Sequence, residues 1–136
     1  MELVIDTNVL FSFFWKNPQT EKILFSGDVE LYSPKFALTE ILKHKNEILK
    51  RAKLPKEEFE SLLGLMKQRV KFIPESEYAE FVSSASKLLG EHKKDADLIA
   101  LSLKTGFPLW TRELKLKELA GVKVLFTLEI AKILDI

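Results

Sequence analysis

The sequence has 136 residues and carries 21 Lys and Arg against 20 Asp and Glu, a formal net charge of +1. It contains no Cys, which excludes disulfides, thiolate metal sites and a Cys nucleophile, and two His residues are too few for a His-based zinc centre. The length predicts one domain over residues 1–136. No apolar run approaches the roughly 18–20 residues of a membrane span, and no secretory signal precedes the first strand, so we expect a cytoplasmic protein.

The first half of the chain alternates short apolar runs with helical patterns. Residues 3–5 and 29–32 are predicted strands, and 3–5 is continuously apolar, as in a parallel sheet with both faces covered. Helical patterns cover four segments, at residues 9–15, 20–26, 36–52 and 55–70. No strand signal separates the last two, so we expect a helical hairpin at about 36–71 on one side of the sheet.

The second half continues the alternation. Further strands are predicted at residues 71–73, 109–111 and 122–126. Helices are predicted between and after them, at 76–89, 95–105, 112–120 and 128–134, with a glycine directly after each of the first three. This order predicts an α/β fold, a three-layer α/β/α arrangement with a central, mainly parallel sheet.

Acidic residues lie where ligands bind in such folds, outside the carboxyl ends of the strands. Asp6 directly follows the first strand, and Glu113 follows the strand at 109–111. Asp95 and Asp97 open a helix that is apolar nearly all round. Each has an ordinary alternative, because acids are favoured as helix caps and in the first helical turn. Together, carboxylates gathered at one edge would repel one another and need hard cations such as Mg²⁺ or Mn²⁺.

Glu40 lies on the predicted helix at 36–52, on the side opposite its apolar stripe. The default interpretation is a solvated surface acid. Phe36, four residues earlier, lies on the same side as Glu40 and indicates that the start of this helix enters the molecule.

With these acids in these places, the chain resembles the PIN-domain (PilT N-terminal) ribonucleases over essentially its full length. The family's opening strand, which ends in Asp and a small or polar pair, matches residues 4–8, and its helical Glu matches Glu40. Its third acid opens a buried helix that ends in Gly eleven residues later, as Asp95 and Gly106 do. Its final Thr/Ser-x-Asp turn matches 111–113, with Glu113 in place of Asp.

The resemblance implies a metal-dependent endoribonuclease that hydrolyses RNA phosphodiester bonds. The implied catalytic carboxylates are Asp6, Glu40, Asp95 and Glu113. The implied Mg²⁺ or Mn²⁺ ligands are Asp6, Glu40, Asp95 and Asp97. Asn8 and Thr111 would orient carboxylates or waters, and the bases that would contact RNA are Arg112, Lys115 and Lys94, with Lys93 and Lys117 beside them. Single-domain relatives are commonly dimeric toxins neutralised by an antitoxin peptide. The resemblance therefore implies a second copy of the chain and an antitoxin peptide as partners.

Two other interpretations stay open. The Glu113 substitution is compatible with a PIN-like module that binds RNA or a partner protein without cleaving. A receiver-type phosphoacceptor domain also gathers acids at strand ends, but residues 45–75 contain no Asp for its central strand. Two apolar groups, residues 11–15 and the stripe at 59–66, are predicted to pack in the core, with a dimer or antitoxin surface as the alternative.

Overall fold

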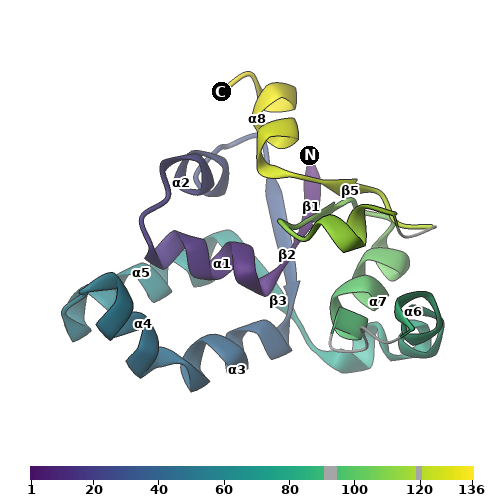
Figure 1. The fold of residues 1–136 in the computed structure, drawn as a ribbon, viewed down its shortest axis with the longest axis horizontal. Helices are drawn as coiled ribbons and strands as arrows, with labels where there is room; N and C mark the ends of the chain where they lie inside the picture. The colour runs from purple at the N-terminus through teal and green to yellow at the C-terminus, as the bar shows by residue number, and fades with distance from the viewer. Residues whose placement is uncertain (91–94, 119–120) are drawn as a thin grey trace.

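The computed structural model describes residues 1–90, 95–118 and 121–136, which form a parallel sheet between layers of helices (Figure 1). The strands lie in the order β3-β2-β1-β4-β5, and every neighbouring pair is parallel. Their bounds are Glu2–Ile5 for β1, Glu30–Pro34 for β2, Val70–Ile73 for β3, Leu109–Trp110 for β4 and Val124–Leu125 for β5. The predicted fold class is confirmed.

Helices cover both faces of the sheet. One side carries α1 to α5, with bounds Thr7–Phe14, Pro18–Leu24, Lys35–Lys43, Lys45–Ala52 and Lys56–Arg69 (Figure 1). The other side carries α6 (Val82–Leu89) and α7 (Ala96–Thr105), while α8 (Thr127–Leu134) packs beside α2. Three 3₁₀ segments complete the described chain, η1 (Glu75–Glu77), η2 (Ala79–Phe81) and η4 (Leu114–Glu118).

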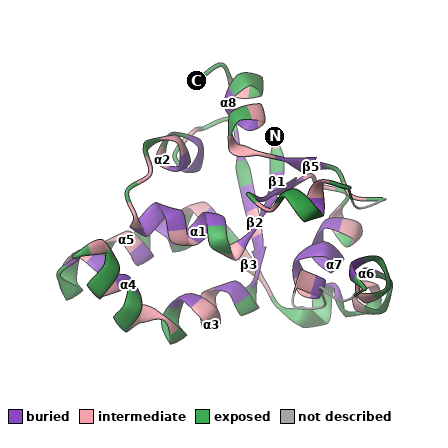
Figure 2. Cartoon of the chain, in the orientation of Figure 1, coloured by how far each residue is buried: buried purple, intermediate pink, exposed green. Residues whose placement is uncertain are grey.

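The continuous apolar run of β1 is explained by two separate cores. Leu3 and Ile5 point into the core shared with α1 to α5, whereas Val4 points into the core shared with α6 and α7. All three side chains are fully buried, and the sheet is buried along its centre (Figure 2). A strand at the centre of a doubly covered sheet has no face left for a polar residue.

The two apolar groups at residues 11–15 and 59–66 pack mostly in the core, as predicted. Phe13, Phe14 and Phe59 are fully buried, with the Phe14 and Phe59 rings stacked 5.0 Å apart between centroids. The most exposed large apolar side chains are instead Leu114 on η4 and Leu128 on α8, at 73% and 67% exposure. None of the helices in residues 1–90, 95–118 and 121–136 has the length and apolar character that a membrane span requires.

Three predicted helices differ from the structure. The segment 36–52 is two helices that meet at His44, so the region 36–71 holds three helices rather than a hairpin of two. The segment 76–89 begins as η1 and η2 and becomes α-helical at Val82, because Tyr78 turns inward and is buried between the two turns. In the segment 112–120, Arg112 and Glu113 are not helical, and Leu114–Glu118 form the 3₁₀ helix η4.

The topology places the site. The chain moves from β1 to β2 on one side of the sheet and later returns to β4 on the other side of β1. In doubly wound sheets this change of direction opens a crevice at the carboxyl ends of the strands. Because α7 runs back across the sheet before β4, its N-terminus lies at that same edge, and Asp95 and Asp97 with it.

Candidate functional site

A hollow of about 290 Å³ at this edge brings together four of the predicted acids, Asp6, Glu40, Asp95 and Glu113. They come from the end of β1, from α3, from the start of α7 and from the segment after β4. Thr7, Asn8, Phe11 and Phe36 complete its lining. We refer to this cavity as the acidic hollow. Its position matches the crevice that the strand order creates.

Asp6 is the most buried of these acids, with 4% exposure. One carboxylate oxygen, Oδ1, accepts the backbone N–H of Asn8 at 3.3 Å and so caps α1, as the ordinary interpretation predicted. The other oxygen, Oδ2, accepts the Thr111 hydroxyl at 2.7 Å. Burial raises the pKa of Asp6, and the charge of Glu113 adds to this, while the hydrogen bonds from Thr111 and Asn8 oppose it.

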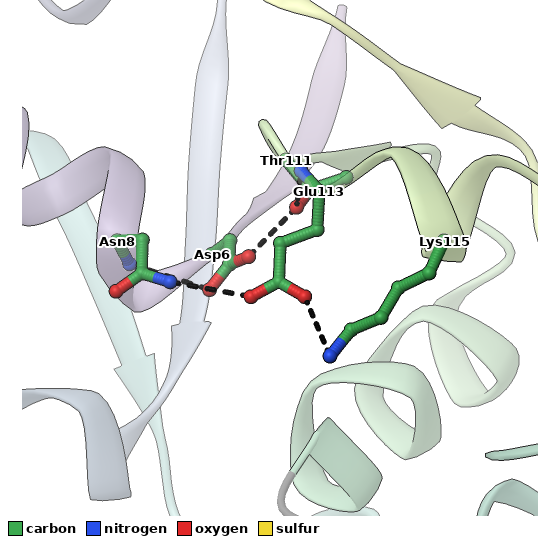
Figure 3. Close-up of polar contacts among 5 residues, drawn as sticks. All are labelled: Asp6, Asn8, Thr111, Glu113 and Lys115. Carbon is green, nitrogen blue, oxygen red and sulfur yellow. Dashed lines mark hydrogen bonds and ion pairs between the residues drawn. The ribbon is translucent and has the colours of Figure 1, made fainter. Parts of the chain in front are cut away.

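Glu113 is tied to the same group of residues (Figure 3). Its Oε1 accepts the Asn8 side-chain amide at 3.3 Å, and Lys115 Nζ lies 3.2 Å from its Oε2. Its backbone N–H donates to the Thr111 hydroxyl oxygen at 3.1 Å. The fully buried Thr111 hydroxyl therefore links the two acids, donating to one and accepting from the backbone of the other.

Glu40 and Asp95 line the hollow from the helices. The Glu40 side chain is 25% exposed, and its Oε2 lies 3.5 Å from His44 Nε2, one turn along the chain. Phe36 lines the hollow with it, as their common side of the helix indicated. Asp95 stands directly before α7, but its carboxylate makes no capping hydrogen bond to that helix.

Asp97 does not line the acidic hollow. It lines a smaller cavity of about 40 Å³ with Asp6 and Asp95, and its Oδ2 accepts the Tyr78 hydroxyl at 3.0 Å. Burial raises the pKa of Tyr78, and the hydrogen bond and charge of Asp97 add to the rise. Sequence reasoning missed Tyr78, because nothing in a local pattern pairs it with an acid nineteen residues away.

A family model of the PIN domain matches residues 4–134. The chain belongs to the PIN domain family. PIN domains are generally nucleases, and the resemblance seen in the sequence is confirmed. A comparison with curated proteins gives no match.

Two solved structures resemble this PIN domain in fold. One is the VapBC2 complex of Rickettsia felis bound to a DNA fragment from its promoter, with a TM-score of 0.69 and 14% identity over 93% of this chain and 98% of that one. The other is a toxin–antitoxin complex from Klebsiella pneumoniae, with a TM-score of 0.66 and 18% identity over 88% of this chain and 94% of that one. At these identities the likeness shows the fold alone.

The predicted RNA-binding bases of the PIN domain differ in their surroundings. Lys115 pairs with Glu113, one of the acids of the hollow. Arg112 is exposed but lines a different cavity, with Phe126 and residues 127–129. Lys117 pairs with Glu129 and donates to the backbone oxygen of Val124 at 3.2 Å. Lys93 and Lys94 lie outside the described residues.

The donor set of the PIN domain suits a hard divalent cation. Among the described residues, no three acidic or histidine side chains form a ready-made metal cluster. The acidic hollow nevertheless offers only carboxylate oxygens as charged ligands, the donors that Mg²⁺ and Mn²⁺ prefer. Burial is the main cause of the raised pKa of Asp6, and the charge of Glu113 adds to it, so a cation at the hollow would offset both effects.

Proposed function

We propose that this PIN domain is a metal-dependent endoribonuclease that hydrolyses RNA phosphodiester bonds. The observation that carries the proposal is the convergence of Asp6, Glu40, Asp95 and Glu113 on one hollow at the carboxyl edge of the sheet. Four carboxylates from distant parts of the chain meet there, although their mutual repulsion disfavours it. A site of this kind suits hydrolysis in which a bound cation contacts the phosphodiester of the substrate.

The four carboxylates would hold one or two Mg²⁺ or Mn²⁺ ions. A bound ion of this kind lowers the pKa of a water molecule and offsets negative charge on the phosphodiester. Thr111 and the Asn8 backbone hold both oxygens of Asp6 in fixed positions, and the Asn8 amide orients Glu113. These contacts preorganise the carboxylates, in the way that outer groups orient metal ligands in other sites.

The remaining predicted residues take supporting roles. Asp97 has one oxygen engaged by Tyr78, so we assign it an indirect role, in which it fixes the start of α7 behind Asp95. Lys115 is the predicted base that pairs with an acid of the hollow, Glu113, and it would contact the phosphate of the substrate. Arg112 would contact RNA outside the acidic hollow, at the cavity that it lines with Phe126 and residues 127–129.

We further propose that the protein is the toxin of a toxin–antitoxin pair, neutralised by an antitoxin peptide in the cytoplasm. Both structural neighbours are toxin–antitoxin complexes, which supports this role. A homodimer is also proposed, with the exposed Leu128 and Ile133 of α8 as apolar surface that a second copy would cover. Size-exclusion chromatography with light scattering measures the mass, and a monomeric mass would contradict the dimer.

A second candidate is a PIN module that binds RNA or a partner without cleaving. Glu113 favours it, because this residue replaces the family's Asp and both of its oxygens already have partners, Asn8 and Lys115. In that case Lys115 would neutralise Glu113 permanently, and the acidic hollow would bind a cation weakly.

Cleavage of single-stranded RNA in Mg²⁺ or Mn²⁺ tests the proposed function. We expect the purified chain to cleave, and Asp6→Asn to lower the rate by more than about 100-fold, since it removes a charged ligand. Asp28→Asn is the matched control, because Asp28 is exposed and precedes β2 at the opposite edge of the sheet. Equal residual activity in the wild type and Asp6→Asn would contradict the proposal.

Thermal unfolding separates the two candidates without relying on activity. A cation at one hundred times its Kd stabilises the folded state by about 2.7 kcal/mol, a rise in Tm of several degrees. We expect Mn²⁺ to raise the Tm of the wild type and of Asp28→Asn, and to leave that of Asp95→Asn nearly unchanged. A wild-type Tm that is indifferent to Mn²⁺ would favour the non-cleaving module.

A further inference from the structure

A second cavity, of about 200 Å³, lies beside the acidic hollow, between α1 and α4. Its lining mixes aromatic, apolar and charged side chains, namely Phe11, Trp15, His44, Glu47, Ile48 and Arg51. We refer to it as the aromatic pocket. Cavities for drug-sized ligands occupy about 300–1,000 Å³, so this one suits a single ring system rather than a larger molecule.

The aromatic pocket and the acidic hollow share a wall. Phe11 lines both cavities. The His44 ring meets Phe11 edge-on, with 6.1 Å between ring centroids, and its Nε2 lies 3.5 Å from Glu40 Oε2 in the hollow. The Phe11 ring and the contact between His44 and Glu40 therefore separate the cavities. A nucleotide chain with a phosphate at the acids would bring a neighbouring base to the pocket.

The chemistry of the pocket fits a nucleobase. The Arg51 guanidinium lies over the Trp15 ring, 4.7 Å from its centroid, and unpaired bases stack on both kinds of plane. Glu47 and His44 border the cavity with polar atoms that can meet the edge of a base. The buried Ile48 adds an apolar surface.

The surrounding charge favours a polyanion over an apolar peptide. Arg51 is exposed at the pocket, and Lys43 and Lys50 are exposed nearby on α3 and α4. Within the part of the chain that the structure describes, no acidic side chain pairs with any of the three. Unpaired basic side chains beside a stacking surface are the combination by which proteins bind single strands.

We propose that the aromatic pocket binds the base of a nucleotide that neighbours the scissile phosphodiester in single-stranded RNA. The proposal rests on the proposed nuclease function and names a substrate subsite for it. Trp15 and Phe11 supply the stacking surface, and Arg51 supplies the charge for the adjoining phosphate. The pocket would set which base flanks the cleavage point.

Tryptophan fluorescence tests this directly, because one of the two tryptophans, Trp110, is fully buried while Trp15 lines the pocket. Short single-stranded oligoribonucleotides, each of one base type and carrying a terminal fluorescein, are titrated in Mg²⁺ with the full chain carrying Asp6→Asn, which prevents cleavage. Quenching of tryptophan reports contact at Trp15, and the anisotropy of the fluorescein gives the Kd of every variant, including those that lack Trp15. We expect quenching that is lost in Trp15→Phe while the Kd changes by no more than a few-fold. Trp15→Ala should raise the Kd by about 5- to 100-fold, as expected for one lost stacking contact.

Arg51→Gln and Leu88→Ala complete the design. Arg51→Gln changes an exposed side chain and should reduce the slope of log Kd against log salt by about one. Leu88→Ala changes an exposed apolar side chain on α6, on the other face of the sheet, and should bind like the parent. Circular dichroism confirms that each variant is folded. Oligonucleotides that bind Trp15→Ala and Arg51→Gln as tightly as Leu88→Ala would overturn the proposal and leave the pocket to a protein segment. Absence of RNA binding by the Asp6→Asn parent would overturn it too.

Different results would reject the nuclease function and the base pocket. Cleavage by the wild type, together with unchanged binding in the Trp15→Ala and Arg51→Gln variants, would reject the base pocket and keep the nuclease. Absence of cleavage by the wild type would reject the nuclease whatever the pocket variants do.

Discussion

Acidic side chains meet opposite surroundings in two regions of this protein. On the outer surface, Glu60, Glu80 and Glu129 each accept a hydrogen bond from a lysine, which lowers the pKa of each carboxyl group. At the carboxyl edge of the sheet, burial raises the pKa of Asp6, and the charge of Glu113 raises it further. The outer acids have basic partners in solvent, whereas Asp6 faces a second carboxylate in a cavity.

The difference indicates which acids serve the fold and which serve a ligand. Exposed ion pairs contribute little to stability, and they need no further explanation. A carboxylate with a raised pKa costs the folded state free energy whenever it is ionised, and such groups gather at functional sites. The acidic hollow is therefore a region in which stability is given up, and a bound cation would restore part of it.

Of the substitutions discussed below, Thr111→Val should have the largest effect on stability, and it should also reduce activity. The change keeps the shape of the side chain but removes the hydroxyl that donates to Asp6 Oδ2 and accepts the Glu113 N–H. We expect nuclease activity to fall by about 10- to 100-fold, the usual cost of losing a group that orients metal ligands. We also expect a loss of about 1–3 kcal/mol in the free energy of unfolding, because buried polar groups lose their partners.

The matched control is Thr111→Ser, which retains the hydroxyl. Urea unfolding and RNA cleavage are measured on both variants. If Thr111→Ser lost as much activity as Thr111→Val, the methyl group rather than the hydroxyl would be the part that matters.

Asp6→Asn should have a smaller effect on stability, and of the opposite sign. The folded-state pKa of Asp6 lies above its unfolded value of 3.8, so the folded protein binds the proton more tightly. Wild-type stability therefore falls as the pH rises from near 3.8 through the folded pKa. The Asn side chain carries no charge and avoids this loss, although its amide nitrogen cannot replace the second accepting oxygen of Asp6. Asp6→Asn should therefore raise the Tm at pH 7 by a few degrees at most.

The test is thermal unfolding in EDTA at several pH values between 4 and 7, because a bound cation would mask the penalty. We expect the gap in Tm between Asp6→Asn and the wild type to widen as the pH rises. A gap that stays constant with pH would show that the charge of Asp6 is not penalised in the fold.

The sequence predicted the fold where the pattern is local. The apolar run of 3–5 and the acids at strand ends could be recognised because a parallel sheet brings its carboxyl ends to one edge. The break at His44 could not, since no Gly or Pro marks it and the apolar spacing is the same on both sides. The inward turn at Tyr78 depends on a hydrogen bond to Asp97 across the fold, which periodicity does not encode.

The candidate site likewise has features that could be predicted from the sequence and features that could not. Asp6, Asp95 and Glu113 were predicted from their places at the ends of elements, and Glu40 from the resemblance to the PIN domain family. All four line one cavity. The pairing of Lys115 with Glu113 depends on how η4 folds back after β4. The aromatic pocket depends on the bend at His44, which places α4 against α1 and so sets Arg51 over Trp15. Contacts between elements are settled by tertiary packing, which local patterns do not specify.

Removing an ion pair on the outer surface should change the Tm least. The sign of that change distinguishes the outer acids from Asp6. Lys104 Nζ lies 2.8 Å from Glu80 Oε1, with both side chains about half exposed, at 46% and 53%. Because the folded pKa of Glu80 is lowered below 4.5, the pair stabilises the fold above that pH and loses this effect as the pH falls through the folded pKa. Glu80→Gln should therefore lower the Tm at pH 7 by no more than about 2 °C, and 1 M NaCl should remove the difference. At neutral pH an outer acid thus gains stability from its charge while Asp6 loses it, so a rise in Tm on Glu80→Gln would contradict the division between the two regions.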